Sequence, residues 1–373
     1  MNGRKRRWLR HAAQLLALPT APLCEEAVAR WIEAFVARRP ALHLAADRWG
    51  NLLIRYAGSR TRRPALVFAA HMDHPGFRAV AMQPDGLLKC RWMGAVPEHL
   101  FPNAKVRFFS CGEWVRGVVQ FLAPGRKGRA TRDVVVAVRS PVGPGSPGMW
   151  DFPDPRIVGT RLFARGCDDA AGVASLVALL DEACRLRLRN GFHVLLTRAE
   201  ESGFLGAIGA CRARTLPEGS VVVTVEASQA LPGAAHGNGP IIRVGDRVSI
   251  FSPNVTRALV EVARDLQRRR PDFRCQRKLM DGGMCESSIY MEYGYPAGGL
   301  SLPLGNYHNI GPCARRLRAE FIDVRDYENL IRLHVAIAQG FRSNRRDGRK
   351  SLKRYERLFL RNRPLLRHPR RGR

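Results

Sequence analysis

No two of the nine cysteines are spaced as a CxxC pair, and no part of the chain is apolar for long. An odd number of scattered cysteines argues against a disulfide framework and against a structural zinc ribbon. The apolar stretches stay below the roughly 18 residues that a membrane-spanning helix needs. The basic N-terminal stretch resembles a signal peptide, but His11, Gln14 and Pro19 interrupt it and no clear cleavage site follows. We therefore expect an amphipathic first helix, a cytoplasmic protein and no membrane span.

Motifs of several other enzyme classes are also missing. There is no GxSxG motif and no cysteine–histidine pair in a recognisable nucleophile context, so serine or cysteine hydrolysis has little support. The glycines do not form a phosphate-binding loop, and the chain has no internal repeat. With 373 residues, of which 45% are hydrophobic, the chain is long enough for one large domain that carries an insertion.

Acidic residues are scarce, at 32 against 62 lysines and arginines, and the formal net charge is +30. The C-terminal segment 342–373 holds fourteen of the basic residues against Asp347 and Glu356. Such a tail is able to contact nucleic acid, an acidic partner or another polyanionic surface, and it is equally typical of a solvated basic end. Within it, four apolar residues have helical spacing and Pro364 follows them, which predicts a short basic amphipathic helix: Leu352, Tyr355, Leu358 and Phe359.

Short apolar runs alternate with helix patterns through most of the chain. The runs lie at 65–70, 162–164, 192–197, 220–225 and 299–302, and the helix patterns at 173–184, 255–268 and 324–339. Continuous apolar runs are typical of strands that are covered on both faces. The alternation therefore predicts an α/β fold with a largely parallel sheet, in which function collects at the carboxyl ends of the strands.

One stretch departs from this alternation. From about residue 77 to 157, short alternating runs are divided by glycine and proline, which predicts a small all-β domain inserted into the α/β domain. We expect a discontinuous catalytic domain formed by residues 1–76 and 158–341, an inserted domain at 77–157 and a basic tail at 342–373.

Histidine and acidic residues follow the predicted strands. Peptide hydrolysis at neutral pH needs an activated water, a polarised carbonyl and a proton acceptor, and two metal ions supply the first two. Carboxylates and imidazoles are the ligands that hold such ions, and they suit zinc, cobalt and manganese. Two adjacent glutamates can divide their roles, one binding metal while the other accepts a proton. The sequence offers the full set, in chain order: His71, Asp73, Asp168, Glu200, Glu201, Glu226 and His308.

These residues lie in segments that resemble the glutamyl-aminopeptidase-like metallopeptidases, which include the tetrahedral aminopeptidases. The matching segments are AAHMDHPGF (69–77), LFARGCDDAAGVA (162–174), RAEESGFLGA (198–207), GNGPIIRVGDR (237–247) and YHNIGP (307–312). The resemblance covers roughly residues 10–340. It implies a zinc-peptidase-like sheet flanked by helices, with an inserted β domain through which subunits form dimers and larger shells.

The resemblance also implies roles for the individual residues. His71 and Glu226 would bind one metal ion and Glu201 and His308 the other, with Asp168 bridging them. Glu200 would be the general base and Asp73 would orient the imidazole of His71. A cis peptide bond between Asp168 and Asp169 is expected as well. The activity implied is removal of N-terminal residues from peptides, with two divalent ions per subunit, zinc being expected and cobalt or manganese the alternatives.

Two substitutions depart from the family pattern, and one spacing favours the aminopeptidases over their relatives. Glu226 stands where the aminopeptidases have Asp, whereas Glu is common in related dizinc deacylases and carboxypeptidases. His74 stands where Glu is usual, and it is expected either to line the substrate cleft or to cap the strand end. The insertion lies early in the chain, between His71 and Asp168, which favours the aminopeptidase branch. A dizinc deacylase or carboxypeptidase, and a basic nucleic-acid-binding protein on a peptidase scaffold, remain the alternatives.

Overall fold

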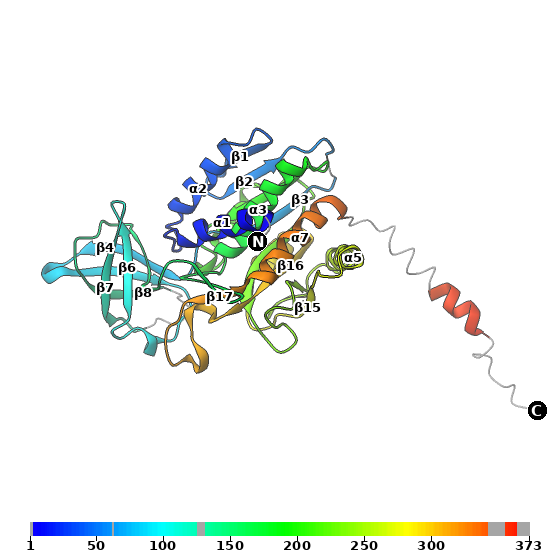
Figure 1. The fold of residues 1–373 in the computed structure, drawn as a ribbon. Helices are drawn as coiled ribbons and strands as arrows, with labels where there is room; N and C mark the ends of the chain where they lie inside the picture. The colour runs from blue at the N-terminus through cyan, green and yellow to red at the C-terminus, as the bar shows by residue number, and fades with distance from the viewer. Residues whose placement is uncertain (1–2, 62, 125–130, 342–354, 364–373) are drawn as a thin grey trace, which may run out of the picture.

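The computed structural model describes residues 3–61, 63–124, 131–341 and 355–363. A large sheet with helices on both faces forms the body, and a small closed barrel lies beside it (Figure 1). The helices of the body are α1 (Gly3–Ala17), α2 (Glu26–Ala37), α3 (Ala170–Leu186), α4 (Leu205–Arg212), α5 (Pro253–Arg269), α6 (Glu286–Glu292) and α7 (Val324–Gly340). The predicted α/β class with an inserted all-β unit is confirmed.

The large sheet has eleven strands. Nine of them follow the order β1 (Leu42–Ala46), β2 (Leu52–Tyr56), β12 (Phe192–Thr197), β3 (Leu66–His71), β13 (Val221–Gln229), β16 (Ala297–Gly305), β17 (Glu320–Asp323), β11 (Arg161–Ala164) and β10 (Arg156–Val158). The remaining two are β14 (Ile241–Arg243), which pairs with β16, and β15 (Gln276–Lys278), which pairs with β14.

The sheet is parallel at its centre and antiparallel towards its edges. Strands β12, β3, β13 and β16 run parallel, as predicted. The pairs β1–β2 and β10–β11 are antiparallel hairpins, so the expectation of a largely parallel sheet is wrong at both ends. The reason is the length of the connections, because a few residues can join only antiparallel neighbours whereas parallel strands need a crossover.

The two faces of the central strands bury different side chains. In β3, Leu66, Phe68 and Ala70 belong to the main hydrophobic core, whereas Val67 and Ala69 belong to a second cluster on the other face. This division follows the alternation of side chains along a strand. Helices α4 and α6 supply residues to the second cluster, and the remaining helices cover the main core.

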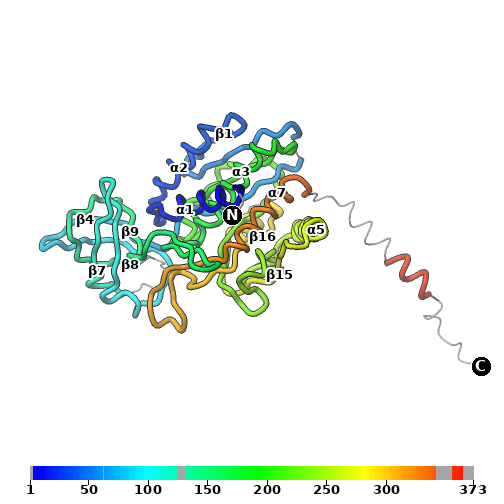
Figure 2. Tube along the Cα trace, viewed as in Figure 1, coloured from blue at the N-terminus to red at the C-terminus, as the bar shows by residue number. Residues whose placement is uncertain are grey.

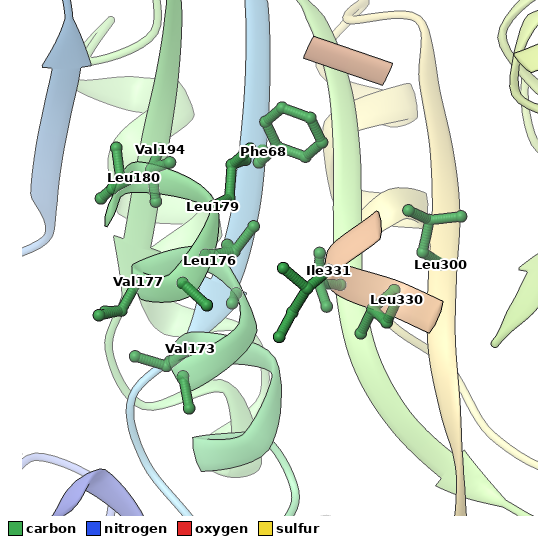
Figure 3. Packing of buried hydrophobic residues seen from close by; sticks show 14 of the residues in the cluster. Phe68, Val173, Leu176, Val177, Leu179, Leu180, Val194, Leu300, Leu330 and Ile331 are labelled. Carbon is green, nitrogen blue, oxygen red and sulfur yellow. The ribbon is translucent and has the colours of Figure 1, made fainter. Parts of the chain in front are cut away.

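Helix α3 lies in the middle of the main core, against the sheet, α1 and α7 (Figure 3). Its sequence predicts one apolar face, but every residue from Ala170 to Ala183 is buried. Figure 3 shows Val173, Leu176 and Leu180 on this helix next to the strands of the sheet, with Ile331 of α7 to the right of the helix. The position of α3 keeps the adjoining Asp168–Asp169 segment close to the carboxyl ends of the central strands.

The barrel consists of β4 (Gly76–Met82), β5 (Leu87–Met93), β8 (Thr131–Val138), β7 (Glu113–Leu122), β6 (Lys105–Ser110) and β9 (Pro147–Trp150), in that order. Its core is rich in aromatic rings: Phe77, Trp92, Phe101, Phe108 and Trp150. Figure 2 shows the barrel at one side of the body that carries α3 and α7. The last barrel strand ends at Trp150. Strand β10, whose residues Arg156 and Ile157 fall within the expected insertion, pairs with β11 in the large sheet.

Two observations concern the ends of the chain. The expected first helix is α1, whose Trp8, Leu9 and Leu16 are buried in the main core. In the C-terminal tail, a helix spans residues 355–362, while Leu352 lies outside the described residues. Among the helices that the structure describes, none combines the length and the apolar character needed to cross a bilayer.

Candidate metal centre

The carboxyl ends of the central parallel strands bring the predicted site residues to one edge of the sheet. His71 is the last residue of β3, Glu200 and Glu201 follow β12 by three and four residues, and Glu226 lies in the second half of β13. His308 follows β16 within a short 3₁₀ turn, Tyr307–Asn309. Asp168 comes from the segment between β11 and α3. The structure thus places side chains from distant parts of the chain around a single position, as expected for a sheet of this type.

Asp168 lies between the two histidines. Its Oδ1 is 3.6 Å from Nε2 of His71, and its Oδ2 is 3.7 Å from Nε2 of His308. Potential ligand atoms form two groups, His71 with Glu200 and Glu226, and Asp168 with Glu201 and His308. Within each group these atoms all lie within 4.8 Å of one another. The peptide bond between Asp168 and Asp169 is cis, which confirms that prediction.

The residues present fit a pair of divalent cations. The donors are imidazole nitrogens and carboxylate oxygens, which suit zinc, cobalt or manganese. Oδ1 of Asp168 is buried and has no hydrogen-bond partner within the described part of the chain. A buried carboxylate oxygen without a partner is costly unless a cation or a proton compensates it. These two observations make the position suitable for metal ions.

Hydrogen bonds fix the orientation of both histidine rings. Nδ1 of His71 lies 3.1 Å from the carbonyl oxygen of Asp73, and Nδ1 of His308 lies 3.3 Å from the carbonyl oxygen of Ala95. Because a carbonyl oxygen only accepts, each Nδ1 must donate, which leaves Nε2 directed towards the carboxylates. Ala95 belongs to the segment between β5 and β6, so the barrel side of the molecule orients His308.

Asp73 contacts the backbone of both adjacent glutamates as well as the ring of His71. Its Oδ1 lies 3.4 Å from Nδ1 of His71, and its two carboxylate oxygens accept the backbone N–H groups of Glu200 and Glu201, each at 3.0 Å. Ala199, the residue before Glu200, is held in a similar way, because its backbone N–H donates to the carboxylate of Glu25 at 2.9 Å. The two adjacent glutamates are therefore held by carboxylates from separate parts of the chain.

The site carries more carboxylates than cations. Burial raises the pKa of Glu226 to about 8, although Arg243 and His71 act in the opposite direction. Burial likewise raises the pKa of Glu200 well above its ordinary value. Burial alone would lower the pKa of His308, but the neighbouring Glu201 and Asp168 raise it to about 9. The cluster thus requires positive charge, which either protons or metal ions provide.

Arg243 is a site residue that the sequence analysis missed. Its guanidinium is buried, and Nη1 lies 3.5 Å from Oε2 of Glu226 and 3.2 Å from Oγ of Ser228. The signal was present in the sequence, because this arginine interrupts the apolar run that begins at Ile241. A basic residue within a buried strand needs an acidic partner, and here the partner is a proposed metal ligand.

His74 and Glu320 contact the backbone of Asp168. Nδ1 of His74 lies 2.6 Å from the carbonyl oxygen of Asp168, and Nε2 lies 3.0 Å from Oδ1 of Asn309. The carboxylate of Glu320 accepts the backbone N–H of Asp168 at 3.0 Å. His74 is buried and is not among the residues that line the cavity, so the structure does not support the expected cleft role. Its ring instead contacts Asp168 and Asn309, a role that differs from the expected cap of the strand end. Nothing in the local sequence indicated the role of Glu320.

A cavity of about 540 Å³, open to solvent, lies over the cluster. Its polar side includes four of the five proposed metal ligands together with Glu200 and Arg243, while His308 is not among the lining residues. A largely apolar part of the wall is formed by Leu231, Met280, Met284 and Tyr307. A wall of this kind suits the side chain of a peptide residue, while the polar side suits the reacting amide.

Comparison with known proteins gives a consistent result. The sequence profile of the M42 glutamyl aminopeptidase family matches residues 50–333. The protein SgcX of Escherichia coli strain K12 is 23% identical over 337 residues, which cover 81% of this chain and 85% of that protein.

Solved structures share the fold. The aminopeptidase APDkam598 from Desulfurococcus kamchatkensis has a TM-score of 0.72 at 22% identity, with 90% of this chain and 95% of that chain covered. The TET1 peptidase of Pyrococcus horikoshii has a TM-score of 0.70 at 20% identity, with 89% and 99% covered. Because the family profile spans most of the chain and includes the whole candidate metal centre, the chain belongs to the M42 glutamyl aminopeptidase family and is a peptidase of the aminopeptidase type.

Proposed function

We propose that this protein removes N-terminal residues from peptides with the help of two divalent metal ions, zinc being the expected metal. The observation that carries the proposal is the position of Asp168, whose two carboxylate oxygens face two different histidines. A carboxylate in that position is suited to bridge two ions. His71 and Glu226 would hold one ion, and Glu201 and His308 the other.

Glu200 is the proposed general base. Its carboxyl group lies in the first group of potential ligand atoms and lines the cavity. Burial raises its pKa, so it is well suited to take a proton from the attacking water and to return that proton to the leaving amine. Bound metal ions would polarise the scissile carbonyl and lower the pKa of the attacking water. Asp73 keeps Glu200 and Glu201 in place through their backbone N–H groups.

A second reaction class is favoured by one residue. Glu226 has one methylene more than the Asp that the aminopeptidases usually carry at this position, and Glu is common in the related dizinc deacylases and carboxypeptidases. A deacylase or carboxypeptidase would act on N-acyl amino acids or on the C-terminal residue of a peptide. The family match favours aminopeptidase activity over this alternative.

The test is a substrate panel combined with metal analysis of the purified protein. We expect turnover of aminoacyl anilides and of short peptides with a free amino terminus, and about two zinc, cobalt or manganese ions per chain. N-acetylation of the same peptides should abolish turnover. Turnover of N-acyl amino acids without turnover of the free-amine substrates would replace the proposal with the deacylase alternative.

Assembly into a homo-oligomer is part of the proposal. The Pyrococcus horikoshii TET1 peptidase is described as able to assemble into a tetrahedron or a large octahedral shell. By analogy, we propose that the barrel of this chain, which forms most of the expected insertion 77–157, contacts other subunits and that the shell admits short peptides. A cytoplasmic location stays a prediction from the sequence.

A further inference from the structure

The helix at residues 355–362 carries an apolar face. Tyr355, Leu358 and Phe359 are spaced i, i+3 and i+4, so they lie on the same side of the helix. Their exposed fractions are 65%, 56% and 53%, and that of the neighbouring Leu360 is 63%. Four large apolar side chains within six consecutive positions therefore face water.

No hydrophobic cluster of the described residues includes these side chains. Elsewhere in the described part of the chain, no six consecutive positions hold more than two exposed large apolar residues, as at Val248 and Ile250. Scattered exposed apolar residues are normal, whereas a contiguous group marks a surface that binds something.

The same helix is basic. Arg357 and Arg361 within it, and Arg363 directly after it, stand against the single acid Glu356. By sequence, the whole segment 342–373 has fourteen basic residues against two acids. Charge complementarity thus favours an anionic partner for this segment. The exposed Leu358, Phe359 and Leu360 also favour a partner that can bind apolar side chains.

These two requirements separate the candidate polyanions. Binding to nucleic acid rests mainly on contacts between cations and phosphates, and exposed aliphatic side chains add little to it. The surface of an anionic bilayer attracts the basic residues and also accepts leucine and phenylalanine between its head groups. We propose that the helix at 355–362 docks on the surface of an anionic lipid bilayer, with Tyr355, Leu358 and Phe359 inserted into the head-group region.

A helix of about two turns needs both contributions, because neither a small apolar surface nor a few charges alone gives stable binding. The peptidase body would then be tethered to a membrane without a transmembrane segment. The proposal is independent of the reaction catalysed, since none of these residues belongs to the candidate metal centre or lines its cavity.

The experiment uses the full chain and sedimentation with vesicles. Vesicles of phosphatidylcholine that contain about one third phosphatidylglycerol are compared with vesicles of phosphatidylcholine alone, and a short DNA duplex is used in parallel. Each basic residue near an anionic surface adds about fivefold to the affinity. We therefore expect binding to the anionic vesicles only, and binding that weakens as salt rises.

Two double variants separate the contributions. Leu358→Ser with Phe359→Ser keeps every charge and should lower vesicle affinity by roughly tenfold or more. Arg361→Gln with Arg363→Gln keeps the apolar face and should lower it by roughly twentyfold at low salt. Leu186→Ser, which removes an exposed leucine from the body, should change nothing. Hydrolysis of a short peptide should be equal in all variants.

Two results would overturn the proposal. If the wild-type chain does not bind anionic vesicles but binds DNA, the tail is a nucleic-acid-binding segment. If the Leu358 and Phe359 double variant binds the vesicles as tightly as the wild type, the apolar face has no part in the contact and the attraction comes from the net charge of the whole chain.

Discussion

Glu200 and Glu201 are neighbours in the chain, but their side chains have different surroundings. Oε1 of Glu201 lies 3.1 Å from Nε2 of His308, in the group of potential ligands that includes Asp168. Glu200 belongs to the other group, with His71 and Glu226, and burial raises its pKa. The structure leaves two roles open to Glu200, metal ligand and general base, and a pair of substitutions separates them.

Glu200→Gln should keep both metal ions and lower turnover by about 10²–10⁴-fold, because an amide cannot accept the proton of the attacking water. Glu201→Gln should instead lower the metal content of the purified protein. Steady-state kinetics and elemental analysis of both variants check this. A Glu200 variant that loses metal, or a loss of turnover below tenfold, would show that Glu200 is not the base.

Arg243 is expected to control the ionisation of Glu226. Its positive charge lowers the pKa of that carboxyl, so Arg243→Met should raise it and weaken metal binding near neutral pH. The expected weakening is about tenfold for each unit by which the pKa rises. Since ligands bind metal in their deprotonated form, the difference from the wild type should shrink as pH rises.

Calorimetric titration with zinc, near neutral pH and about two units higher, measures this effect. Arg243→Lys, which keeps the charge, is the matched control and should restore most of the affinity. Equal zinc affinity in the methionine variant and the wild type would show that Glu226 does not depend on Arg243.

At the scale of elements, the sequence predicted the central strands and the main helices because their patterns are local. Strands β3, β12, β13 and β16 appear where the apolar runs indicated them, each followed by or containing a site residue. The antiparallel strand pairs at the two ends of the sheet could not be predicted, because an apolar run indicates a strand but not the direction in which it pairs. The sequence of helix α3 predicts a single buried face because its apolar spacing does not show that α1 also packs against the helix.

The supporting residues of the site could not be found in the same way. The contact between His74 and Asn309 joins positions 235 apart, and no spacing rule links such residues. Glu320 acts through backbone N–H groups, which carry no sequence signal. The pattern of candidate ligands was visible because each of them stands near a strand end, whereas the residues that contact these ligands are far apart in the sequence, as Glu320 of β17 and Arg243 of β14 are.

Helix α7 places His334 inside the main core. The side chain is fully buried, edge-on to Phe68 at a ring distance of 5.5 Å, and burial lowers its pKa to about 3. An unfolded histidine has a pKa near 6.5. Between these two values the unfolded chain binds a proton that the folded chain does not bind, so the free energy of unfolding falls as pH falls.

The contribution of His334 should be about 1.4 kcal/mol for each pH unit below about 6.5. His334→Leu removes the titrating group and should therefore flatten the loss of stability between about pH 6.5 and about pH 4.5. Urea unfolding over this range measures it. His43→Gln, at an exposed position of β1, should behave like the wild type. Parallel pH profiles for His334→Leu and the wild type would contradict this assignment.

For the whole molecule, the proposed role of the barrel in assembly can be tested on its surface. Deleting the barrel would also remove Ala95, which orients His308, so a deletion would confuse assembly with activity. Among the described barrel strands, the exposed large apolar residues are Val80 of β4 and Phe121 of β7. Val80→Asp with Phe121→Asp should give smaller particles in light scattering, because charges in an apolar contact are costly.

Leu186→Asp on the body is the control for the barrel variant and should leave the particle size unchanged. Peptidase activity on a short substrate should persist in the barrel variant, because neither position contacts a proposed ligand. An unchanged particle size in the barrel variant would place the subunit contacts elsewhere on the molecule.

The contact between Ala95 and His308 has a consequence for the newly made chain. A ribosome delivers His71 first, then the barrel, then Asp168 and the two glutamates, and His308 only near the end of the catalytic body. The ring of His308 takes its orientation from a carbonyl group that was synthesised some two hundred residues earlier. An N-terminal portion of the chain that ends before His308 does not contain all the proposed metal ligands. We therefore expect a growing chain to lack peptidase activity until its body is nearly complete.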